Sequence, residues 1–394
     1  MFVLAKSASM AERKEQAGMV TKDEALASAR LLADWHVVNL NRDFEGCGSA
    51  GSFPFTVSPD KKSITAAADW NVAFGIMGML SAGKVFGEEK YLETAHQMAY
   101  FLGTLQVFSP FLPNDYGSFR EVTPQTTWSF LRDALSAAWG CLCYYEATDN
   151  EEFLERARLW GEWFLKHGMD ETGWPIWGTF PGKRKEGWLP EMHLDMHGCF
   201  HGGSLNFFYH LARLTGDKKW VGDFYEHIAD YFVEFIQQPD GYFRTIEKKT
   251  RQVPPNDPQS GLHRGNDDLG TLGLLGAWKT FGKQSYLDSI EKFLRAAFAN
   301  QTAEGFFEAS CAAIPVLLNI ADEAQGLIGF EPPGEAVERA IRALLSRQFP
   351  GTAEPIFAGG LDELGDGGLC CRSMGYALLW LLKRFGGDKR YLSI

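Results

Sequence analysis

The stretch GDKKWV at residues 216–221 is one copy of a spaced pattern that decides the fold. A small or acidic residue, polar residues, an aromatic residue and an aliphatic residue follow in order, and the pattern recurs as GEEKYL at 87–92, DNEEFL at 149–154, GKQSYL at 282–287 and GDKRYL at 387–392. Each copy follows an apolar stretch rich in small residues, and most copies open an amphipathic stretch, so each predicts the turn of a helical hairpin. The spacing is nearly constant, and the longest gap has room for one further turn at 331–335, which is typical of a repeat architecture.

Two kinds of helix alternate along the chain. One kind repeats apolar residues at spacings of three and four and is charged on its other side, which predicts a single wet face. The other kind is apolar nearly all round, which predicts burial on every side. The first kind comprises 22–41, 90–106, 151–167, 219–237, 284–299 and 333–348; the second comprises 66–83, 124–145, 197–215, 264–282, 306–323 and 367–384.

This alternation predicts an all-α fold, an (α/α)6 barrel in which an inner ring of six helices lies inside an outer ring of six. An open α-solenoid is the alternative, and it is disfavoured because it would keep one face of each inner helix wet. No linker rich in Pro, Gly or Ser interrupts the hairpins, so we expect one domain at 21–394 after a flexible arm at 1–20.

The connections predict where a binding site lies. Links from an inner to an outer helix are short, whereas links from an outer to an inner helix are long, at 42–65, 107–123, 168–196, 238–263 and 349–366. Long loops at one end of a rigid scaffold usually carry the binding site. We therefore expect a mouth formed by these loops and by the first turns of the inner helices, whose N-termini favour anions.

Composition excludes several classes of protein. A net charge of −12 argues against nucleic-acid binding, and no apolar run is long enough to span a membrane or to act as a signal peptide. The seven Cys are an odd number without framework spacing, which predicts free thiols in a reducing compartment. Walker, Rossmann, Ser-elbow and CxxC motifs are missing. We expect a soluble cytoplasmic protein, a monomer or homodimer, that needs no cofactor or metal.

The richest cluster of chemical groups is LPEMHLDMHGCFHGG at residues 189–203, which enters the inner helix predicted at 197–215. It places His193, Asp195, His197 and His201 at the predicted mouth, where they could act as acid or base or could bind sugar hydroxyls. A metal site is less favoured, because zinc sites have a tighter set of ligands. Alternatively, these side chains only cap the helix or form buried hydrogen bonds.

A second cluster, GLHRGNDDLG at residues 261–270, opens the inner helix predicted at 264–282. The cations of His263 and Arg264 beside the paired Asp267 and Asp268 indicate a tuned catalytic or substrate-binding site. Alternatively, the two acids are first-turn carboxylates that the helix dipole favours behind an Asn266 cap.

The loop at 114–128 joins Asp115, Tyr116, Arg120 and Glu121 to Trp128, which starts a buried helix. Indole and phenol rings stack on the flat faces of sugars, so aromatic residues on or near the long loops favour a carbohydrate site, although some may belong to the core. These aromatic residues are Trp70, Trp128, Trp174, Trp177, Trp188 and Tyr242.

Two further groups of charges belong to the same end of the predicted barrel. Asp69 and Asp133 are acids in otherwise apolar inner helices, where a charge needs a partner or a wet lumen. Around the last loop, Asp362, Glu363, Asp366 and Arg372 complete a ring of charged residues, with Arg372 as a candidate substrate ligand.

Two stretches resemble the six-hairpin carbohydrate enzymes, and among them the unsaturated glucuronyl and rhamnogalacturonyl hydrolases. The stretch 207–217, FFYHLARLTGD, is similar to an inner helix of that family that runs into an LTGD turn after a catalytic Asp, which implies Asp195. His263-Arg-Gly-Asn266 is similar to the RGNGW motif of the family, with Asp267 and Asp268 in place of Gly-Trp. The resemblance implies that an Asp protonates an unsaturated uronyl ring and activates water, without a metal.

We therefore predict a glycoside hydrolase acting on a short, uronate-containing oligosaccharide, with Asp195 as acid/base and Asp267 or Asp268 as second carboxylate. Arg264, Arg120 and His201 would hold the sugar. One alternative is a lyase that cleaves uronates by β-elimination, in which Tyr116 or a His removes the proton and an Arg neutralises the carboxylate. A third is a sugar epimerase of the N-acylglucosamine 2-epimerase type with two His as bases. A toroid that only binds carbohydrate or protein would not need converging acids and bases.

Overall fold

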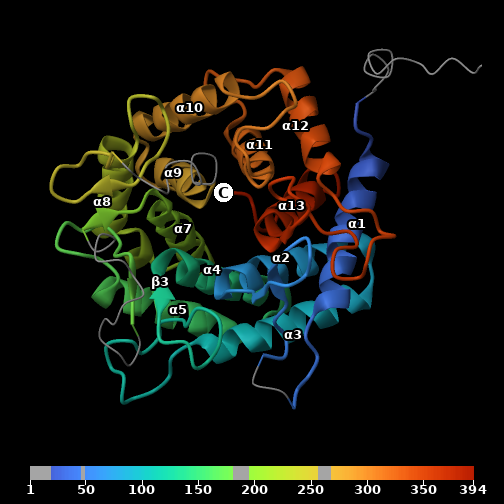
Figure 1. The fold of residues 1–394 in the computed structure, drawn as a ribbon. Helices are drawn as coiled ribbons and strands as arrows, with labels where there is room; N and C mark the ends of the chain where they lie inside the picture. Colours follow the sequence, from blue (N-terminus) through green and yellow to red (C-terminus); the bar gives the residue numbers. More distant parts are fainter. Residues whose placement is uncertain (1–18, 46–48, 181–194, 256–267) are drawn as a thin grey trace, which may run out of the picture.

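The computed structural model describes residues 19–45, 49–180, 195–255 and 268–394, with the side chain of residue 268 left out. In these ranges two kinds of α-helix alternate along the chain (Figure 1). The outer helices are α1 (Lys22–Asn39), α3 (Glu89–Leu105), α5 (Glu151–His167), α8 (Asp223–Tyr231), α10 (Gln284–Ala299) and α12 (Gly334–Ser346). The inner helices are α2 (Asp69–Phe86), α4 (Leu131–Thr148), α7 (Ser204–Thr215), α9 (Asp268–Phe281), α11 (Ala313–Ala324) and α13 (Cys371–Arg384).

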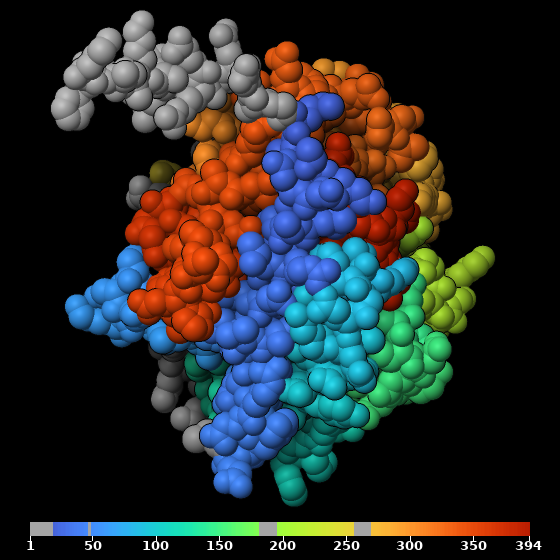
Figure 2. Space-filling view, turned by 90° about the vertical axis from the view of Figure 1, so that its right-hand side faces the viewer, coloured from blue at the N-terminus to red at the C-terminus, as the bar shows by residue number. Residues whose placement is uncertain are grey.

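The inner helices form a closed ring, which confirms the predicted (α/α)6 barrel. Each inner helix contacts the next in chain order, and α13 packs back against α2. Figure 2 shows the seam from the side, where the blue residues of α1 lie between cyan residues of α3 and orange residues near the end of the chain. The side-chain NH of Trp35 on α1 donates to the carbonyl oxygen of Ile356 across this seam, at 2.8 Å. An open solenoid is therefore excluded.

The repeated turn pattern has one backbone geometry in all five copies. The first residue of each copy adopts a left-handed conformation with φ between 55° and 79°, and in the first four copies it directly follows the last residue of the preceding inner helix. The aromatic residue of each copy is at most 2% exposed, so it anchors the turn in the core. In the last copy this anchored turn leads into the C-terminal segment instead of a further helix. The anchors are Tyr91, Phe153, Trp220, Tyr286 and Tyr391.

The inner helices begin later than the sequence predicts. The second begins at Leu131 instead of 124, and the fifth and sixth boundaries shift in the same way, to Ala313 and Cys371. The residues before two of them are extended because they pair with other loops. Strand β3 (Ser129–Phe130) pairs with β4 (Gly178–Thr179), and β7 (Leu369–Cys370) pairs with β1 (Pro54–Val57).

Short secondary-structure elements fill the remaining connections. β1 also pairs with β2 (Ile64–Ala66), and β5 (Met196–His197) pairs with β6 (Ile246–Glu247). The 3-10 helices Cys199–Gly203 and Lys218–Val221 precede α7 and α8, and a π-helical turn, Phe232–Ile236, follows α8. The outer helix predicted at 219–237 is thus three shorter helical pieces.

Each connection from an outer to an inner helix carries a glycine with φ between 80° and 105°. A Cβ atom at any of these glycines would come within 3 Å of an atom of the next outer helix, so the loop backbone touches that helix directly. For Gly359 that helix is α1, where the Leu31 carbonyl oxygen would be 2.6 Å away. The glycines are Gly51, Gly117, Gly173, Gly241, Gly305 and Gly359.

Four of the outer helices are each followed by a glutamine that strengthens the contact between the loop and the next outer helix. Its side-chain amide donates to the carbonyl oxygen of a glycine in the following loop and to a backbone carbonyl oxygen of the next outer helix. In the last case the amide of Gln348 reaches Ser28 on α1, at 3.0 Å, and so joins the end of the ring to its beginning. The four glutamines are Gln106, Gln237, Gln301 and Gln348.

The C-terminal segment crosses the end of the ring where the inner helices finish (Figure 1). Tyr391 and Leu392 are buried, and the carbonyl oxygen of Leu392 accepts from the buried Lys383 ammonium at 2.7 Å. Arg390 donates to the Leu80 carbonyl oxygen near the end of α2, and Lys279 of α9 donates to the carbonyl oxygen of Ile394. The N-terminal ends of the inner helices therefore form the other rim.

Six cysteines of the described ranges are free thiols, and five of them are buried; Cys47 lies outside these ranges. A search of the described helices finds no membrane-spanning candidate by length and apolar character.

Candidate functional site

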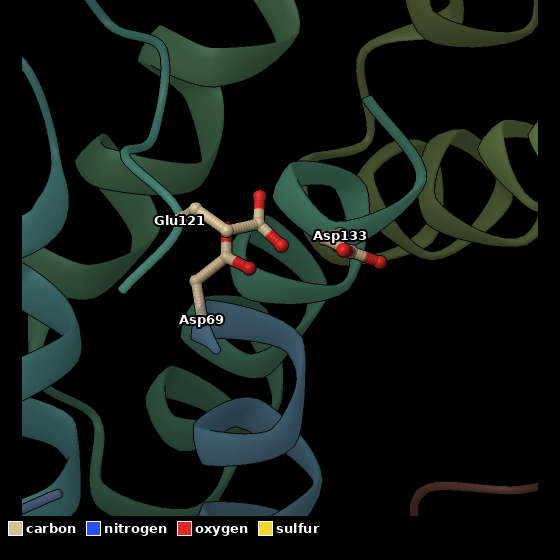
Figure 3. A group of neighbouring side chains, drawn as sticks. All are labelled: Asp69, Glu121 and Asp133. Atoms are coloured by element: carbon tan, nitrogen blue, oxygen red, sulfur yellow. The ribbon is translucent and has the colours of Figure 1, made fainter. Parts of the chain in front are cut away.

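Three carboxyl groups meet at the rim where the inner helices begin (Figure 3). Asp69 is the first residue of α2, Asp133 lies in the first turn of α4, and Glu121 comes from the loop between α3 and α4. One oxygen of each lies within 4.8 Å of the others. Asp69 is fully buried, Glu121 is 5% exposed, and Asp133 is half-buried. We refer to these residues as the acidic triad.

Backbone hydrogen bonds hold the triad in place. The Asp69 amide donates to the Glu121 carbonyl oxygen at 2.7 Å, which ties the start of α2 to the loop. The Glu121 carboxyl accepts from the Phe130 amide at 3.1 Å, just before α4 begins. One oxygen of Asp69 accepts from the amide of Trp70, whereas its other oxygen, Oδ2, is buried without a hydrogen-bond partner among the described residues. A buried unsatisfied oxygen costs free energy, on the order of 1–3 kcal/mol.

Burial raises the pKa of all three carboxyl groups. The nearby charge of Asp133 raises the pKa of Asp69 and of Glu121 further, because two carboxylates at this distance repel each other. The pKa of Asp133 is raised mainly by burial, and it is held down in part by the Glu121 hydrogen bond and by Arg132. A hydrogen bond between two carboxyl groups requires a proton on one of them, so the triad retains protons above the ordinary carboxyl range.

Arg132 lies next to Asp133 in sequence and is fixed by three inner helices. Its guanidinium donates to the hydroxyl of Tyr376 on α13 at 2.7 Å and to the hydroxyl of Ser136 one turn further along α4. The guanidinium carbon is 5.7 Å from the ring centroid of Trp70 on α2. The rim therefore combines converging carboxyl groups with one rigidly held cation.

This arrangement can serve two chemical purposes. Carboxyl groups with raised and unequal pKa values can give and take protons near neutral pH. Three converging carboxylate oxygens are also a suitable donor set for a hard divalent cation such as Ca²⁺. The prediction that no metal is needed stays a prediction.

Two of the predicted histidines, His197 and His201, are buried in the segment that leads into α7. His201 is fully buried in the 3-10 helix before α7, with its ring 5.3 Å from Trp177. The carbonyl oxygen of Trp177 accepts from the Leu131 amide at the start of α4, which places His201 on the same rim as the triad. Asp195 is exposed in a turn, and its carbonyl oxygen accepts from the Lys248 amide. His193 lies outside the described residues.

His197 belongs to a buried hydrogen-bond network that joins two long loops. Its Nε2 lies 2.9 Å from Asp170, and its Nδ1 lies 2.8 Å from the hydroxyl of Tyr231. Lys248 also contacts Asp170, at 2.8 Å. Hydrogen bonds from His197, Lys248 and Thr172 lower the pKa of Asp170 despite its burial. This environment matches the alternative of a hydrogen-bonded imidazole in the interior.

Of the second predicted cluster, the structure describes Asp268, Leu269 and Gly270, which begin α9. In the ring, α9 is the third inner helix from α2 in either direction, so the start of α9 lies across the rim from Asp69. The side chain of Asp268 is not described. His263, Arg264, Asn266, Asp267 and Trp188 lie outside the described residues.

Some of the predicted residues of the loop at 107–128 lie near the rim, and others lie on the surface. Trp128 is half-buried, and its carbonyl oxygen accepts from the amide of Glu121. Tyr116 is 42% exposed and contacts the ring of Phe108. Arg120 donates to the Thr126 carbonyl oxygen inside the loop. Asp115 is half-buried near the tip, where its carbonyl oxygen accepts from Ser118.

Arg372 and Tyr242 lie at some remove from the triad. Arg372, in the first turn of α13, pairs with the carboxylate of Glu363 and donates to the hydroxyl of Ser310 at 3.1 Å. Tyr242 is buried against α10, where its hydroxyl donates to the Ala296 carbonyl oxygen. Among the predicted aromatic residues that the structure describes, Trp70 is hydrogen-bonded to Asp69, and Trp128 to Glu121, through their backbones.

Sequence reasoning did not place Asp69, Glu121 and Asp133 in one site. A signal for two of them was present, because each is an acid in an otherwise apolar inner helix. Glu121 carried no such signal and was noted only among the charged residues of the loop at 114–128, because an acid in a polar loop does not need a partner. The sequence analysis instead predicted the site from the clusters of His and Asp at 189–203 and 261–270.

Comparison with known proteins shows the fold. No protein-family model and no curated protein matches this sequence. A cellobiose 2-epimerase from Bacillus thermoamylovorans is similar in structure, with a TM-score of 0.69 and 14% identity over 92% of this chain and 99% of that one. A glycoside hydrolase family 76 mannosidase from Bacteroides thetaiotaomicron has a TM-score of 0.65 and 11% identity over 92% and 98%.

An inactive variant of an α-1,6-mannanase from Salegentibacter, in complex with α-1,6-mannotriose, is also similar. Its TM-score is 0.61, with 13% identity over 92% of this chain and 99% of that one. The similarity to these structures spans nearly the whole barrel and confirms the fold class. The predicted closeness to the unsaturated glucuronyl hydrolases stays a prediction.

Proposed function

We propose that this protein is a carbohydrate-active enzyme, a glycoside hydrolase that acts on a short, uronate-containing oligosaccharide by carboxyl acid/base catalysis. The acidic triad carries this proposal. Three carboxyl groups in contact, at the rim of a fold shared with a mannosidase and a mannanase, provide both a proton donor and a proton acceptor. The inactive mannanase variant of this fold has two aspartates replaced, which supports carboxyl chemistry in an enzyme of this fold.

The three residues would have different tasks. Asp133 is the most exposed of the triad, so it would exchange the proton with the substrate. Glu121, hydrogen-bonded to Asp133, would supply or withdraw that proton. Asp69 has a raised pKa and adds to the negative potential that keeps a proton in the group. Asp133 takes the role that the sequence suggested for Asp195.

The spacing of the carboxyl groups limits the mechanism. The oxygens lie within 4.8 Å of one another, closer than the roughly 6.5–9.5 Å that leaves room for water between two carboxyls in inverting enzymes. The triad therefore suits a reaction in which one carboxyl gives a proton and later takes one back. Adding water across the double bond of an unsaturated uronyl ring is such a reaction, since the proton that water releases restores the acid.

A sugar epimerase is the second candidate. The similarity to a cellobiose 2-epimerase over 99% of that chain favours it, together with the imidazole of His201 on the same rim. Epimerisation needs a base that removes a proton from carbon, and an imidazole can do this. β-Elimination is less favoured, because Tyr116 lies on the exposed loop surface against Phe108 and away from the triad.

One set of assays separates these activities. The protein is incubated with saturated and unsaturated uronate oligosaccharides, and with cellobiose and α-1,6-mannotriose. Ultraviolet absorbance of the unsaturated ring is followed together with reducing ends and the identity of the sugars. Loss of absorbance indicates the unsaturated hydrolase, gain indicates a lyase, and new reducing ends at constant absorbance indicate an ordinary glycosidase. Isomerised sugar without cleavage would establish the epimerase in its place.

Replacing Asp133 with Asn tests the triad directly. Because the amide cannot transfer the proton, we expect kcat to fall by about 10²–10⁴-fold while the fold is retained. Asp195→Asn, the variant that the sequence pointed to, should keep most of its activity, and Glu93→Gln on the exposed face of α3 serves as a further control. Full activity in Asp133→Asn, or loss in Asp195→Asn alone, would remove the triad from the mechanism.

A further inference from the structure

A pocket with a volume of about 630 Å³ lies at the end of α12 on the outer ring. Its walls come from the last turn of α12 and from the connections that lead into α11 and α13. Because both connections lead to the starts of inner helices, the pocket lies at the same end of the barrel as the acidic triad. The side chains that bear on its chemistry are Glu304, Phe306, Ser346, Arg347, Phe349 and Asp362.

The guanidinium of Arg347, just after α12, has a fixed position. Its carbon atom lies 4.7 Å from the ring centroid of Phe306, so the cation packs on an aromatic ring. It also fills the space beside Gly365, where an added Cβ atom would overlap Nη1 of Arg347. The carbonyl oxygen of Arg347 accepts from the amide of Asp362 at 2.8 Å, which holds the loop against the helix end. A ligand in the pocket would therefore meet a cation whose place is already set.

The charge of Arg347 is not used within the ranges that the structure describes. No described residue accepts a hydrogen bond from its guanidinium or forms an ion pair with it. Other arginines nearby differ in this respect. Arg342, which lines the same pocket, is paired with Glu338 at 2.9 Å. Arg295 on α10 is paired with Glu291 at 2.7 Å. Arg347 thus keeps its charge and its side-chain donors for a ligand, and it is half-buried at the pocket wall.

Two carboxylates limit the kind of anion that suits the pocket. The Asp362 carboxylate accepts from the backbone amides of residues 365, 366 and 367 at 2.6–3.0 Å, and Glu304 is exposed. They would repel a phosphate group, with its charge of about −1.5 to −2, more strongly than a carboxylate with a single charge. Carboxylates also accept hydrogen bonds from hydroxyl groups, and Ser346 adds a hydroxyl that can donate or accept. This set suits a molecule that carries one carboxylate and several hydroxyls.

An apolar wall completes the pocket. Phe349 is half-buried, and its ring centroid lies 5.1 Å from that of Phe357, so its position is fixed by packing. Pro350 follows it in the lining. Sugar rings have flat C–H faces that pack on aromatic and apolar surfaces. A sugar that carries a carboxylate therefore matches the pocket in charge, in hydrogen bonding and in its apolar face.

We propose that this pocket is a second carbohydrate-binding site, in which Arg347 binds the carboxylate of an acidic sugar. Asp362 and Glu304 accept from the sugar hydroxyls, and Phe349 packs on the ring. The site is separate from the acidic triad, which lies where α2 and α4 begin. The inference rests on the proposed function for the source of the ligand, since a further sugar unit of the uronate substrate would be held here.

Isothermal titration calorimetry with glucuronate, glucose and inorganic phosphate tests the site. We expect the Kd for glucuronate to rise about 10- to 100-fold in Arg347→Gln, the value of one charge-assisted interaction, and glucose to bind far more weakly than glucuronate. Arg347→Lys, which keeps the charge but loses the planar fork, should fall between the wild type and Arg347→Gln. Gly365→Ala keeps the arginine but displaces its guanidinium, so it should also weaken binding. Thermal unfolding shows whether each variant is folded.

Arg295→Gln is the matched control. Arg295 also packs on a phenylalanine, with its guanidinium carbon 5.0 Å from the ring centroid of Phe330, but its charge is already paired. Its replacement should leave the Kd for glucuronate unchanged. Equal affinity of the wild type and Arg347→Gln for glucuronate would overturn the site. Phosphate binding that is tighter than glucuronate binding and depends on Arg347 would overturn the acidic sugar as the ligand.

The same measurements separate this inference from the proposed function. Asp133→Asn should bind glucuronate in the pocket as the wild type does, because Asp133 does not line it. Binding that depends on Arg347, in a protein that turns over none of the sugars, would overturn the glycosidase and leave the pocket as a sugar site. Turnover of a uronate oligosaccharide by a protein whose glucuronate affinity is the same with and without Arg347 would overturn the pocket alone.

Discussion

Glu121 links the chemistry of the rim to the stability of the fold. One of its oxygens accepts from the Phe130 amide, and its carboxyl is hydrogen-bonded to Asp133. Its pKa is raised, so the native protein binds this proton more tightly than the unfolded chain does. The native state is therefore most favoured below the ordinary carboxyl pKa, and stability is lost as the pH rises towards the folded pKa of Glu121.

Glu121→Gln should remove this loss. The glutamine oxygen can accept from Phe130 and its amide can donate to Asp133, and no proton has to be held. We expect the variant to unfold at a higher temperature than the wild type at pH 7.5, with the difference shrinking towards pH 4; one unit of pKa shift corresponds to about 1.4 kcal/mol. Thermal unfolding across this pH range measures it, with Glu93→Gln as control. A variant that is less stable at pH 7.5 would show that the ionised carboxylate stabilises the fold.

At the scale of single residues, sequence predicted the types of group in the site better than their identity. Trp70 and Trp128 were placed beside the site, and His201 was placed on the rim. Asp133 was noticed as an acid in an apolar helix but could not be joined to Glu121, because their contact depends on how the loop folds back on α4. Hydrogen bonds between a loop and a helix start leave no periodic mark in a sequence.

At the scale of elements, the outer-to-inner connections set the spacing of the outer helices. Each brings a left-handed glycine against the next outer helix, and four follow a glutamine that bonds to the same helix. The sequence predicted the length of these connections and their end of the barrel. It missed their shared geometry, because one glycine in a variable loop is a weaker signal than an aromatic anchor in a short turn.

Gly305 tests this geometry. Its φ is 105°, and a Cβ atom there would lie 2.3 Å from the carbonyl oxygen of Arg339 on α12. Gly305→Ala should destabilise the protein by more than about 1 kcal/mol, since the strain of the backbone and the clash act together. Gly334→Ala is the matched control, because Gly334 opens α12 with no atom within 4 Å of its added Cβ. That change should be neutral or stabilising by up to about 1 kcal/mol. Equal urea midpoints for the two variants would show that the loop can move away.

At the scale of the whole molecule, the ring closes where Gln348 and Gly359 hold α1 against the last connection. The sequence predicted twelve alternating helices and a closed barrel, because helices that are apolar all round must be covered on every side. It could not predict the seam itself. The contacts there join residues about 320 positions apart, and no local pattern marks such pairs.

The seam can be compared with an ordinary contact between neighbours. Gln301 makes the same two kinds of hydrogen bond to α12 that Gln348 makes to α1, and both side chains are half-buried. In a closed ring, Gln348→Ala and Gln301→Ala should each lower the free energy of unfolding by about 1–2 kcal/mol. Urea denaturation measures both variants. If Gln301→Ala lowers the free energy of unfolding and Gln348→Ala does not, the ring opens at the seam in solution.

The position of the C-terminal segment bears on how a sugar would reach the barrel. Tyr391 and Leu392 are buried at the end of the barrel opposite the acidic triad, where the C-terminal segment is tied to α2 and α9 and covers the ends of these inner helices. Under the proposed function, a sugar bound beside Asp133 would enter and leave at the rim where the inner helices begin. This geometry would favour removal of sugars from the ends of short chains.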